Sequence, residues 1–202
     1  MRRALLVVLL SAVAYARFLR EPILTWGATS EEAAATLPGD ELLPDPDGAS
    51  TRAITIDAPP DCVWPWIAQM GPEPRGGVYT YDWIENLLGL NIHTKDEILE
   101  EFQHPKIGDT IGLGANRMII ELVDAPRSLA WRSADGNWLW SFNCVATAGG
   151  GTRLISRNRF HLNRLIDRIG ILPMEPGSLV MERKMLLGIK ERAERLAASR
   201  AA

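Results

Sequence analysis

The stretch from residue 110 to residue 160 alternates between apolar and polar positions with a period of two. Such alternation places successive side chains on opposite faces of a β-strand. The breaks in the pattern are short and rich in glycine or proline, which favours antiparallel neighbours joined by tight turns. The pattern predicts five strands, at residues 110–113, 118–123, 128–133, 137–146 and 152–160.

A further strand is predicted at residues 54–57, which alternate in polarity and are mostly β-branched. The sequence Ala-Pro-Pro-Asp at 58–61 ends this strand and begins a helix. Proline suits a first helical turn, and an acid there suits the positive end of the helix dipole. We therefore expect the folded domain to begin at Thr51. Apolar residues recur at helical spacing in the next segment, at Val63, Trp64, Trp66, Ile67 and Met70.

Helical spacing also predicts a long helix from Ser178 to about residue 198, near the end of the chain. A shorter helix is expected at residues 162–169. The segment 172–177 contains two prolines and is expected to separate these two helices. The remaining expectations are a capped helix at 30–37, a linker at 43–50, a short strand at 78–81, and helices at 82–88 and 95–102.

The last predicted strand carries polar residues on a face that we expect to point inward. Ser156 and Asn158 alternate there with Leu154 and Phe160, while three arginines share the opposite face. Buried polar groups require hydrogen-bond partners. We expect Ser156 and Asn158 to bond to each other, to water or to the head group of a ligand.

Composition limits the function classes. The chain has 202 residues, of which 47% are hydrophobic and 23% are charged, so it suits one domain with a sizeable core and an appendage. A net charge of −3 gives no basic field for nucleic acid. The two cysteines, Cys62 and Cys144, form neither a disulfide framework nor a metal signature. Each is expected to be a small buried hydrophobe.

The N-terminus is distinct from the rest of the chain. Met-Arg-Arg precedes an apolar run at residues 4–16, which is shorter than the ~20 residues of a spanning helix. Three interpretations remain open: a cleaved export signal, an uncleaved membrane anchor, and an apolar helix docked on the domain. We therefore expect a membrane-associated or exported protein, with a cytoplasmic one as the alternative. The predicted parts are a signal or anchor at 1–20, a short helix and linker at 21–50, and the folded domain at 51–198.

Two groups of titratable residues have ordinary explanations. Asp82 and Glu85 have the spacing of a helix capping box, which accounts for both without catalysis. The spacing of His93, Glu97, Glu100 and His104 would suit a metal only on one continuous helix, and Pro105 argues against that continuity. We predict no catalytic residue, no metal and no cofactor.

The segment from Ile56 to Trp64 reads Ile-Asp-Ala-Pro-Pro-Asp-Cys-Val-Trp. This resembles the opening of the START-like superfamily, also called SRPBCC or Bet v 1-like, where an apolar strand leads into Ala-Pro, an acid and a Val-Trp pair. The chain is more narrowly similar to uncharacterised bacterial members that carry a Trp-Pro-Trp helix, an Arg-Gly-Gly loop and a Pro-Met-Glu-Pro-Gly segment.

The resemblance implies an α+β helix-grip fold, in which a curved antiparallel sheet of six or seven strands wraps around a long C-terminal helix. It also implies a cavity between sheet and helix, where known members bind lipids, sterols, polyketides or plant hormones. A minority of members catalyse cyclisation or dehydration. The superfamily has no shared catalytic motif, so the resemblance specifies fold better than chemistry.

We therefore predict that the chain binds, and possibly carries, a small hydrophobic molecule or lipid in this cavity. One alternative is an enzyme of the polyketide cyclase/dehydrase type, which would need titratable groups such as Glu85, Glu175 or His161 to converge there. Another is a structural domain with a filled core that acts through protein contacts. The candidate ligand-binding residues are Trp64, Arg75, Tyr79, Tyr81, Trp131, Trp140, Phe142, Ser156, Asn158, Met181 and Met185.

Overall fold

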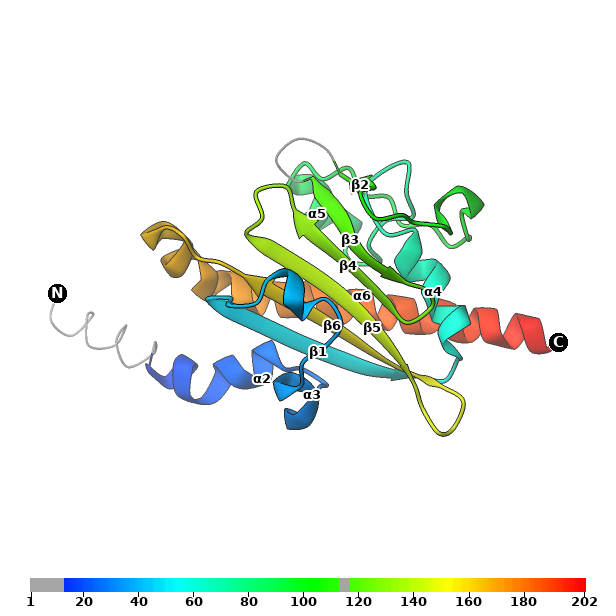
Figure 1. Cartoon of the computed structure of the whole chain (residues 1–202), viewed down its shortest axis with the longest axis horizontal. Helices are drawn as coiled ribbons and strands as arrows, with labels where there is room; N and C mark the ends of the chain where they lie inside the picture. The colour runs from blue at the N-terminus through cyan, green and yellow to red at the C-terminus, as the bar shows by residue number, and fades with distance from the viewer. Residues whose placement is uncertain (1–12, 113–116) are drawn as a thin grey trace, which may run out of the picture.

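The computed structural model describes residues 13–112 and 117–202. Its centre is one antiparallel sheet of six strands in the order β1-β6-β5-β4-β3-β2 (Figure 1). Five of these strands were predicted from the period of two, although Leu113, the last residue of the first of them, lies outside the described residues. The strands are β1 (Gly48–Ile56), β2 (Thr110–Ile111), β3 (Met118–Asp124), β4 (Ser128–Ser133), β5 (Trp138–Ala146) and β6 (Thr152–Phe160).

Strand β1 is longer than the sequence predicts. It begins at Gly48, inside the predicted linker, and pairs with β6 along its whole length from Gly48 opposite Phe160 to Ile56 opposite Thr152. The predicted strand at 78–81 is wrong, because these residues lie in a loop. Just before this loop, Gly71 and Gly77 pair through a single antiparallel β-bridge.

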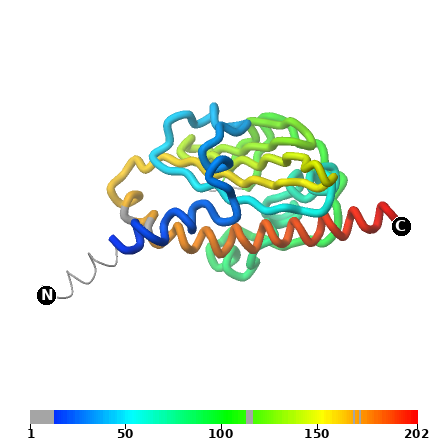
Figure 2. Tube along the Cα trace, turned by 90° about the horizontal axis from the view of Figure 1, so that it is seen from below, coloured from blue at the N-terminus to red at the C-terminus, as the bar shows by residue number. Residues whose placement is uncertain are grey.

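The C-terminal helix α6 (Leu165–Ala201) lies along one face of the sheet (Figures 1 and 2). Met185, Ile189 and Ala193 are fully buried on it, as their spacing predicts. The predicted separation into two helices is wrong. Pro173 and Pro176 both lie inside one continuous helix of 37 residues.

Helix α4 (Pro60–Ala68) packs against α6 and closes one end of the core. Both of its tryptophans are buried, although they point to different sides of the helix. Trp66 packs edge-on against Tyr79, with ring centroids 6.1 Å apart, and Tyr79 donates a hydrogen bond of 2.9 Å to the carbonyl oxygen of Trp66.

The segment between α4 and β2 is less helical than predicted. Helix α5 (Asp82–Leu87) forms, but residues 95–102 contain only the short 3₁₀ turn η3 (Glu100–Phe102). The predicted capping box is also wrong. Asp82 accepts hydrogen bonds from the main-chain N–H and hydroxyl of Thr94, and Glu85 accepts one from Thr80.

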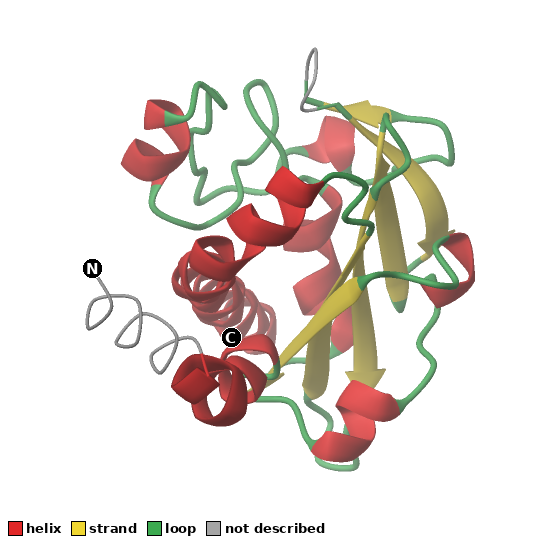
Figure 3. Cartoon of the chain, turned by 90° about the vertical axis from the view of Figure 1, so that its left-hand side faces the viewer, coloured by secondary structure: helices red, strands yellow, loops and turns green. Residues whose placement is uncertain are grey.

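Ahead of β1 the chain forms η1 (Tyr15–Leu19), α2 (Arg20–Leu24), α3 (Ser30–Ala34) and η2 (Asp40–Leu42). Thr29 and Glu32 form the capping box of α3, which ends three residues before the predicted boundary at residue 37. Figure 3 shows α6 on one side of the sheet and short helices on the other side. We call residues 26–47, which cross the outer face of the sheet, the strap.

The arginines of β6 hold the strap in place. Arg157 is almost fully buried and donates to the carbonyl oxygens of Glu32, Ala33 and Ala35 as well as to the Asp40 carboxylate. Arg153 pairs with Glu32 at 2.7 Å, and Arg159 donates to the carbonyls of Leu43 and Pro44. The row of arginines on the outer face is therefore covered by protein.

The strap begins against the free edge of the sheet. The main-chain N–H of Ala53 in β1 donates to the carbonyl oxygen of Trp26 at 3.2 Å. Gly27 follows with a φ of 74°, a conformation that favours glycine. A side-chain carbon at Gly27 would also collide with the carbonyl oxygen of Ala53, so the chain passes β1 closely at this point.

Candidate ligand pocket

A pocket of about 1140 Å³ lies between the inner face of the sheet, the first half of α6 and the segment 70–92. Its walls are mainly apolar, and polar side chains line it at several places, including a group around Glu182 that we call the polar end. The sheet contributes Trp131, Trp138, Trp140 and Asn158; helix α6 contributes Met174, Glu175, Ser178, Met181, Glu182 and Met185; the segment 70–92 contributes Met70, Val78, Thr80, Glu85 and Ile92.

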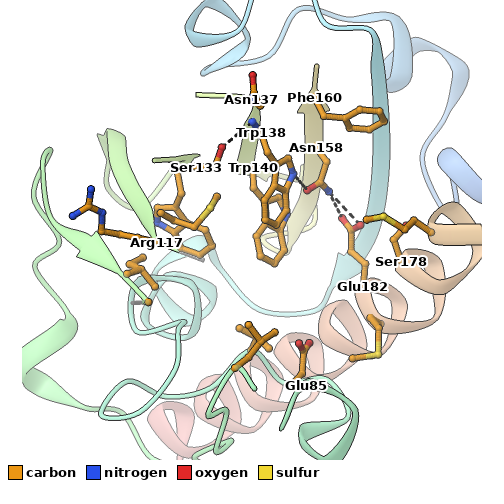
Figure 4. Close-up of a pocket in the computed structure, with 18 of the residues that line it drawn as sticks. Glu85, Arg117, Ser133, Asn137, Trp138, Trp140, Asn158, Phe160, Ser178 and Glu182 are labelled. Atoms are coloured by element: carbon orange, nitrogen blue, oxygen red, sulfur yellow. Dashed lines mark hydrogen bonds between the residues drawn. The ribbon is translucent and has the colours of Figure 1, made fainter. Parts of the chain in front are cut away.

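Tryptophans form the sheet side of the pocket (Figure 4). The rings of Trp138 and Trp140 are stacked, with centroids 5.7 Å apart, and Trp131 meets Trp140 edge-on at 5.4 Å. Their alternation along β4 and β5 places them on one face. The indole N–H of Trp138 donates to Asn158 Oδ1, and that of Trp140 donates to Ser156 Oγ, each at 2.9 Å. The rings thus offer apolar surface while their two N–H groups are satisfied by β6.

Glu182 of α6 is the centre of the polar end. Its carboxylate accepts hydrogen bonds from Ser156 Oγ at 2.5 Å and from Asn158 Nδ2 at 3.3 Å. It also forms a close ion pair with the fully buried guanidinium of Arg52. Burial raises the pKa of Glu182, and the charge of Arg52 opposes this shift. A charged group thus lines the pocket only because a buried cation compensates it.

Arg52 also connects three parts of the chain. It lies on β1, and its other guanidinium N–H groups donate to the carbonyl oxygen of Ile23 at 3.1 Å and to Ser178 Oγ at 3.0 Å. The N-terminal segment, the edge of the sheet and helix α6 therefore meet at this one side chain.

A second ion pair involves Glu175, which precedes Glu182 by about two turns of α6. Glu175 is buried and accepts hydrogen bonds from Arg20 at 2.8 Å and from the Tyr15 hydroxyl at 2.8 Å. Burial and this hydrogen bond raise the pKa of Tyr15 to about 12. Both partners of Glu175 come from η1 and α2, so these helices are fixed beside the first half of α6.

Glu85 lines a different side of the pocket, on α5 (Figure 4). Its carboxylate is half-buried and accepts a hydrogen bond of 2.9 Å from Thr80 Oγ1. Burial raises the pKa of Glu85, because its charged form is less well solvated there, and the bond from Thr80 opposes the shift.

This shift predicts a pH dependence of stability. The folded-state pKa of Glu85 lies above its unfolded value of about 4.3, so the folded state binds the proton more tightly. The free energy of unfolding should therefore fall as the pH rises through the window between the two pKa values. In Glu85→Gln this part of the decrease should be missing when urea unfolding is followed across that window. An unchanged pH profile in the variant would contradict the assignment.

Five of the predicted ligand-binding residues lie together in the pocket wall: Trp131, Trp140, Asn158, Met181 and Met185. The other six lie elsewhere. Ser156 is directly behind the wall, bonded to Trp140 and Glu182. Trp64, Tyr79 and Phe142 are buried in the core, and Tyr81 is partly exposed beside the pocket-lining Thr80.

Arg75 has a role that its sequence context did not indicate. Its guanidinium donates to the carbonyl oxygens of Met70 at 2.7 Å and Ala68 at 2.6 Å, and it lies over the ring of Phe102 at 4.5 Å. Burial lowers the pKa of Arg75. The side chain completes the C-terminal end of α4, where main-chain carbonyls lack helical partners.

Sequence reasoning missed Glu182, which lines the pocket, and Arg52, which pairs with it from β1. A signal for Glu182 was present: Ser178, Glu182 and Met185 are four and three residues apart, which places a carboxyl on the apolar face of the long helix. An acid on such a face requires a buried partner. Alternation along β1 places Arg52 on the same face as the buried Ile56, so Arg52 could have been predicted as that partner.

Nothing in the described ranges forms a metal site, since no three histidine, cysteine, aspartate or glutamate side chains gather as ligands within residues 13–112 and 117–202. The hypothetical face of His93, Glu97, Glu100 and His104 does not exist, because residues 95–102 are not one helix. In the same described part of the chain, no helix is long and apolar enough to cross a membrane. The predicted signal or anchor lies mostly in residues 1–12, outside these ranges.

The strand order and the long helix across one face are the arrangement that the START-like resemblance implies. The chain has a START-like, helix-grip fold. No family model matches the sequence, and no curated protein matches it. The helix-grip fold is established by the strand order of the sheet and by the long helix α6 across one of its faces.

Solved structures similar to the helix-grip domain share little sequence with it. Protein MLL2253 from Mesorhizobium loti is 17% identical, with a TM-score of 0.40 over 77% of this chain and 99% of its own. The Polyketide_cyc-like protein Cgl2372 from Corynebacterium glutamicum is 16% identical, with a TM-score of 0.38 over 76% and 91%. Aha1 from Colwellia psychrerythraea, solved as a dimer, is 14% identical, with a TM-score of 0.43 over 73% and 96%.

Proposed function

We propose that this helix-grip domain binds a small hydrophobic molecule or lipid in the pocket between the sheet and α6. The observation that supports this most directly is a pocket of about 1140 Å³ whose walls are mainly apolar, with tryptophan and methionine side chains among them. Ligand sites commonly have about 300–1,000 Å³, mainly apolar walls and a small number of placed polar groups. The pocket also weighs against the alternative of a filled core.

The apolar walls would supply most of the affinity. Enclosing roughly 400 Å² of apolar ligand surface at about 25 cal/mol per Å² yields about 10 kcal/mol before the cost of association. A micromolar complex requires about 8 kcal/mol. The polar end, formed by Glu182 and Asn158, would then orient the ligand more than it strengthens binding.

The proposal predicts that filling the pocket abolishes binding. Met181 lines the pocket, so Met181→Trp would occupy part of its volume. Native mass spectrometry of the gently purified protein should show a copurifying small molecule in the wild type and at least roughly tenfold less of it in Met181→Trp. The matched control is Val180→Trp, because Val180 is the neighbouring residue, is 54% exposed and does not line the pocket.

If both tryptophan variants retain the ligand, the pocket is not the binding site. If neither the wild type nor the control carries any molecule, titration with the apolar dye anilinonaphthalene sulfonate provides a second test. Binding of the dye to the control but not to Met181→Trp is the expected result. Equal binding to both would exclude the pocket.

Glu85 favours a second candidate function, acid–base catalysis of the cyclase/dehydrase type. A half-buried carboxyl with a raised pKa beside an apolar pocket is suited to proton transfer. Glu175 and His161 also line the pocket, although Glu175 is occupied by Arg20 and Tyr15. Turnover of a synthetic poly-β-ketone thioester by the wild type, lost in Glu85→Gln, would favour this candidate over simple binding.

A further inference from the structure

The buried and half-buried carboxyl groups of the pocket lie on two of its walls. Glu175 and Glu182 line it from α6, and Glu85 lines it from α5 (Figure 4). Each of the first two is compensated by an arginine, Arg20 and Arg52 respectively, and neither arginine lines the pocket. A ligand would therefore meet carboxylate oxygens, while the balancing positive charges lie outside the wall.

The hydroxyl and indole donors around the carboxyl groups are already in use. Each of these groups has a single polar hydrogen. Five of them, in the wall or directly behind it, donate that hydrogen to other protein atoms: Thr80 to Glu85, Trp138 to Asn158, Trp140 to Ser156, Ser156 to Glu182, and Ser178 to the carbonyl oxygen of Glu175. A carboxylate can accept about four hydrogen bonds, so Glu85, with one from Thr80, has acceptor capacity left for a ligand.

Glu85 is the pocket carboxyl without a positive partner. In the part of the chain that the structure describes, no arginine, lysine or histidine pairs with it, and its hydrogen bond comes from the neutral Thr80. The charge that acts on it is that of Asp82 on the same helix, which is also negative. A half-buried carboxylate in an apolar pocket is poorly solvated, so a cation supplied by a ligand would stabilise it.

The tryptophans of the pocket add a second preference for positive charge. The stacked rings of Trp138 and Trp140 form the sheet side, and the carboxyl of Glu85 points toward the same space (Figure 4). The face of an indole ring attracts a cation that lies within about 6 Å of its centre. A positively charged group between these walls would therefore meet both carboxylate oxygens and aromatic surface.

The arginines that line the pocket lie at its rim. Arg117 and Arg164 are both exposed, and the Arg117 guanidinium points away from the tryptophans (Figure 4). An anionic molecule, such as anilinonaphthalene sulfonate, can therefore place its apolar part in the pocket while its charged group remains at the rim. The interior itself offers an anion no comparable cation.

We propose that the pocket selects an apolar amine, whose protonated nitrogen pairs with Glu85, over an apolar carboxylate of the same shape. This inference rests on the proposed function, because it names the chemical class of the ligand for the same pocket. The ammonium group would donate to the Glu85 carboxylate, and such a charge-assisted hydrogen bond is stronger than a neutral one. A carboxylate in the same place would meet like charge, which is unfavourable.

The experiment compares three probes of similar shape and different charge: 2-(2-naphthyl)ethylamine, 2-(2-naphthyl)ethanol and 2-naphthylacetic acid. Isothermal titration calorimetry at neutral pH measures their binding to the full chain, to Glu85→Gln and to the matched control Glu101→Gln. The amide oxygen of the first variant can still accept the hydrogen bond from Thr80, so this variant should fold. Glu101 is exposed and outside the pocket, and its replacement changes the net charge equally.

We expect the amine to bind at least about tenfold more tightly than the acid, with the alcohol between them. Glu85→Gln should weaken binding of the amine about tenfold, to the level of the alcohol, and should leave the alcohol within about twofold. Glu101→Gln should change none of the three. An acid that binds as tightly as the amine, or a preference for the amine that survives in Glu85→Gln, would overturn the inference.

The neutral alcohol separates this result from the proposed function. If the alcohol binds and Met181→Trp abolishes its binding, the pocket is a binding site whatever the charged probes do, and the charged probes then test the amine preference alone. If the alcohol binds equally well to Met181→Trp, or if none of the three probes binds, the proposed function fails and the amine preference fails with it.

Discussion

Replacing Arg52 by methionine should lower the free energy of unfolding by about 3–5 kcal/mol at neutral pH. The guanidinium is fully buried, and without it the carboxylate of Glu182 would remain in the pocket wall with no compensating cation. The bonds to Ile23 and Ser178 would be lost as well. Equilibrium unfolding in urea would measure the change.

The pH dependence identifies the cause. In Arg52→Met, the folded-state pKa of Glu182 should rise further above its unfolded value, since the opposing charge is gone. The penalty should then shrink as the pH falls, and it should be smallest below the unfolded pKa of about 4.3, where Glu182 is protonated in both states. The double variant with Glu182→Gln should regain much of the stability. A penalty that is the same at every pH would mean that lost packing, and not the unpaired charge, is the cause.

Replacing Arg157 by methionine should have the second largest effect, about 3 kcal/mol. Arg157 is buried under the strap and pairs with the buried carboxylate of Asp40. Without it, that carboxylate would keep the hydrogen bond from the main-chain N–H of Leu37 and the longer contact to Arg159 at 3.5 Å. Three strap carbonyls would lose their donor. Hydrogen exchange should therefore increase in the strap, residues 26–47, more than in the sheet.

The control for both arginine variants is Arg127→Met. Arg127 forms a bidentate contact with Asp124, but its side chain is 70% exposed, so its removal should cost at most about 1 kcal/mol. A similar loss of stability in all three variants would contradict the claim that burial decides the effect. Unchanged exchange in the strap of Arg157→Met would contradict its role there.

The sequence was sufficient for strands β3 to β6 because one face of each of these strands is buried. Period-two alternation is enforced wherever a slip of one residue would expose the core. Strands β3 to β6 accordingly begin and end within one residue of their predicted bounds. The same rule placed Trp140 and Asn158 on the inner face, where both line the pocket.

What could not be predicted depends on contacts between distant segments. Pro173 and Pro176 argue locally for a break, yet the helix continues through them, where Tyr15 and Arg20 bind Glu175. Asp82 has the local spacing of a cap, yet it binds Thr94 across a loop. Local rules describe what a segment prefers, whereas tertiary partners decide what it does.

The polar end of the pocket was hidden for the same reason. Ser156 and Asn158 were expected to need partners, but nothing in the local sequence pairs them with Glu182, which lies more than 20 residues away. The ion pair with Arg52 spans 130 residues. A charged side chain in a strand or on an apolar helix face indicates that a partner exists, and only the fold shows which one.

The passage of Trp26 and Gly27 along β1 has a further consequence, for self-association. Strand β1 is nine residues long and lies at the edge of the sheet, so its unpaired main-chain groups could accept a strand from another molecule. The carbonyl of Trp26 occupies the N–H of Ala53 in the middle of that edge, and the missing side chain of Gly27 lets the chain lie close enough to do so. One glycine in the strap thus lets the chain itself occupy a main-chain donor in the middle of this edge.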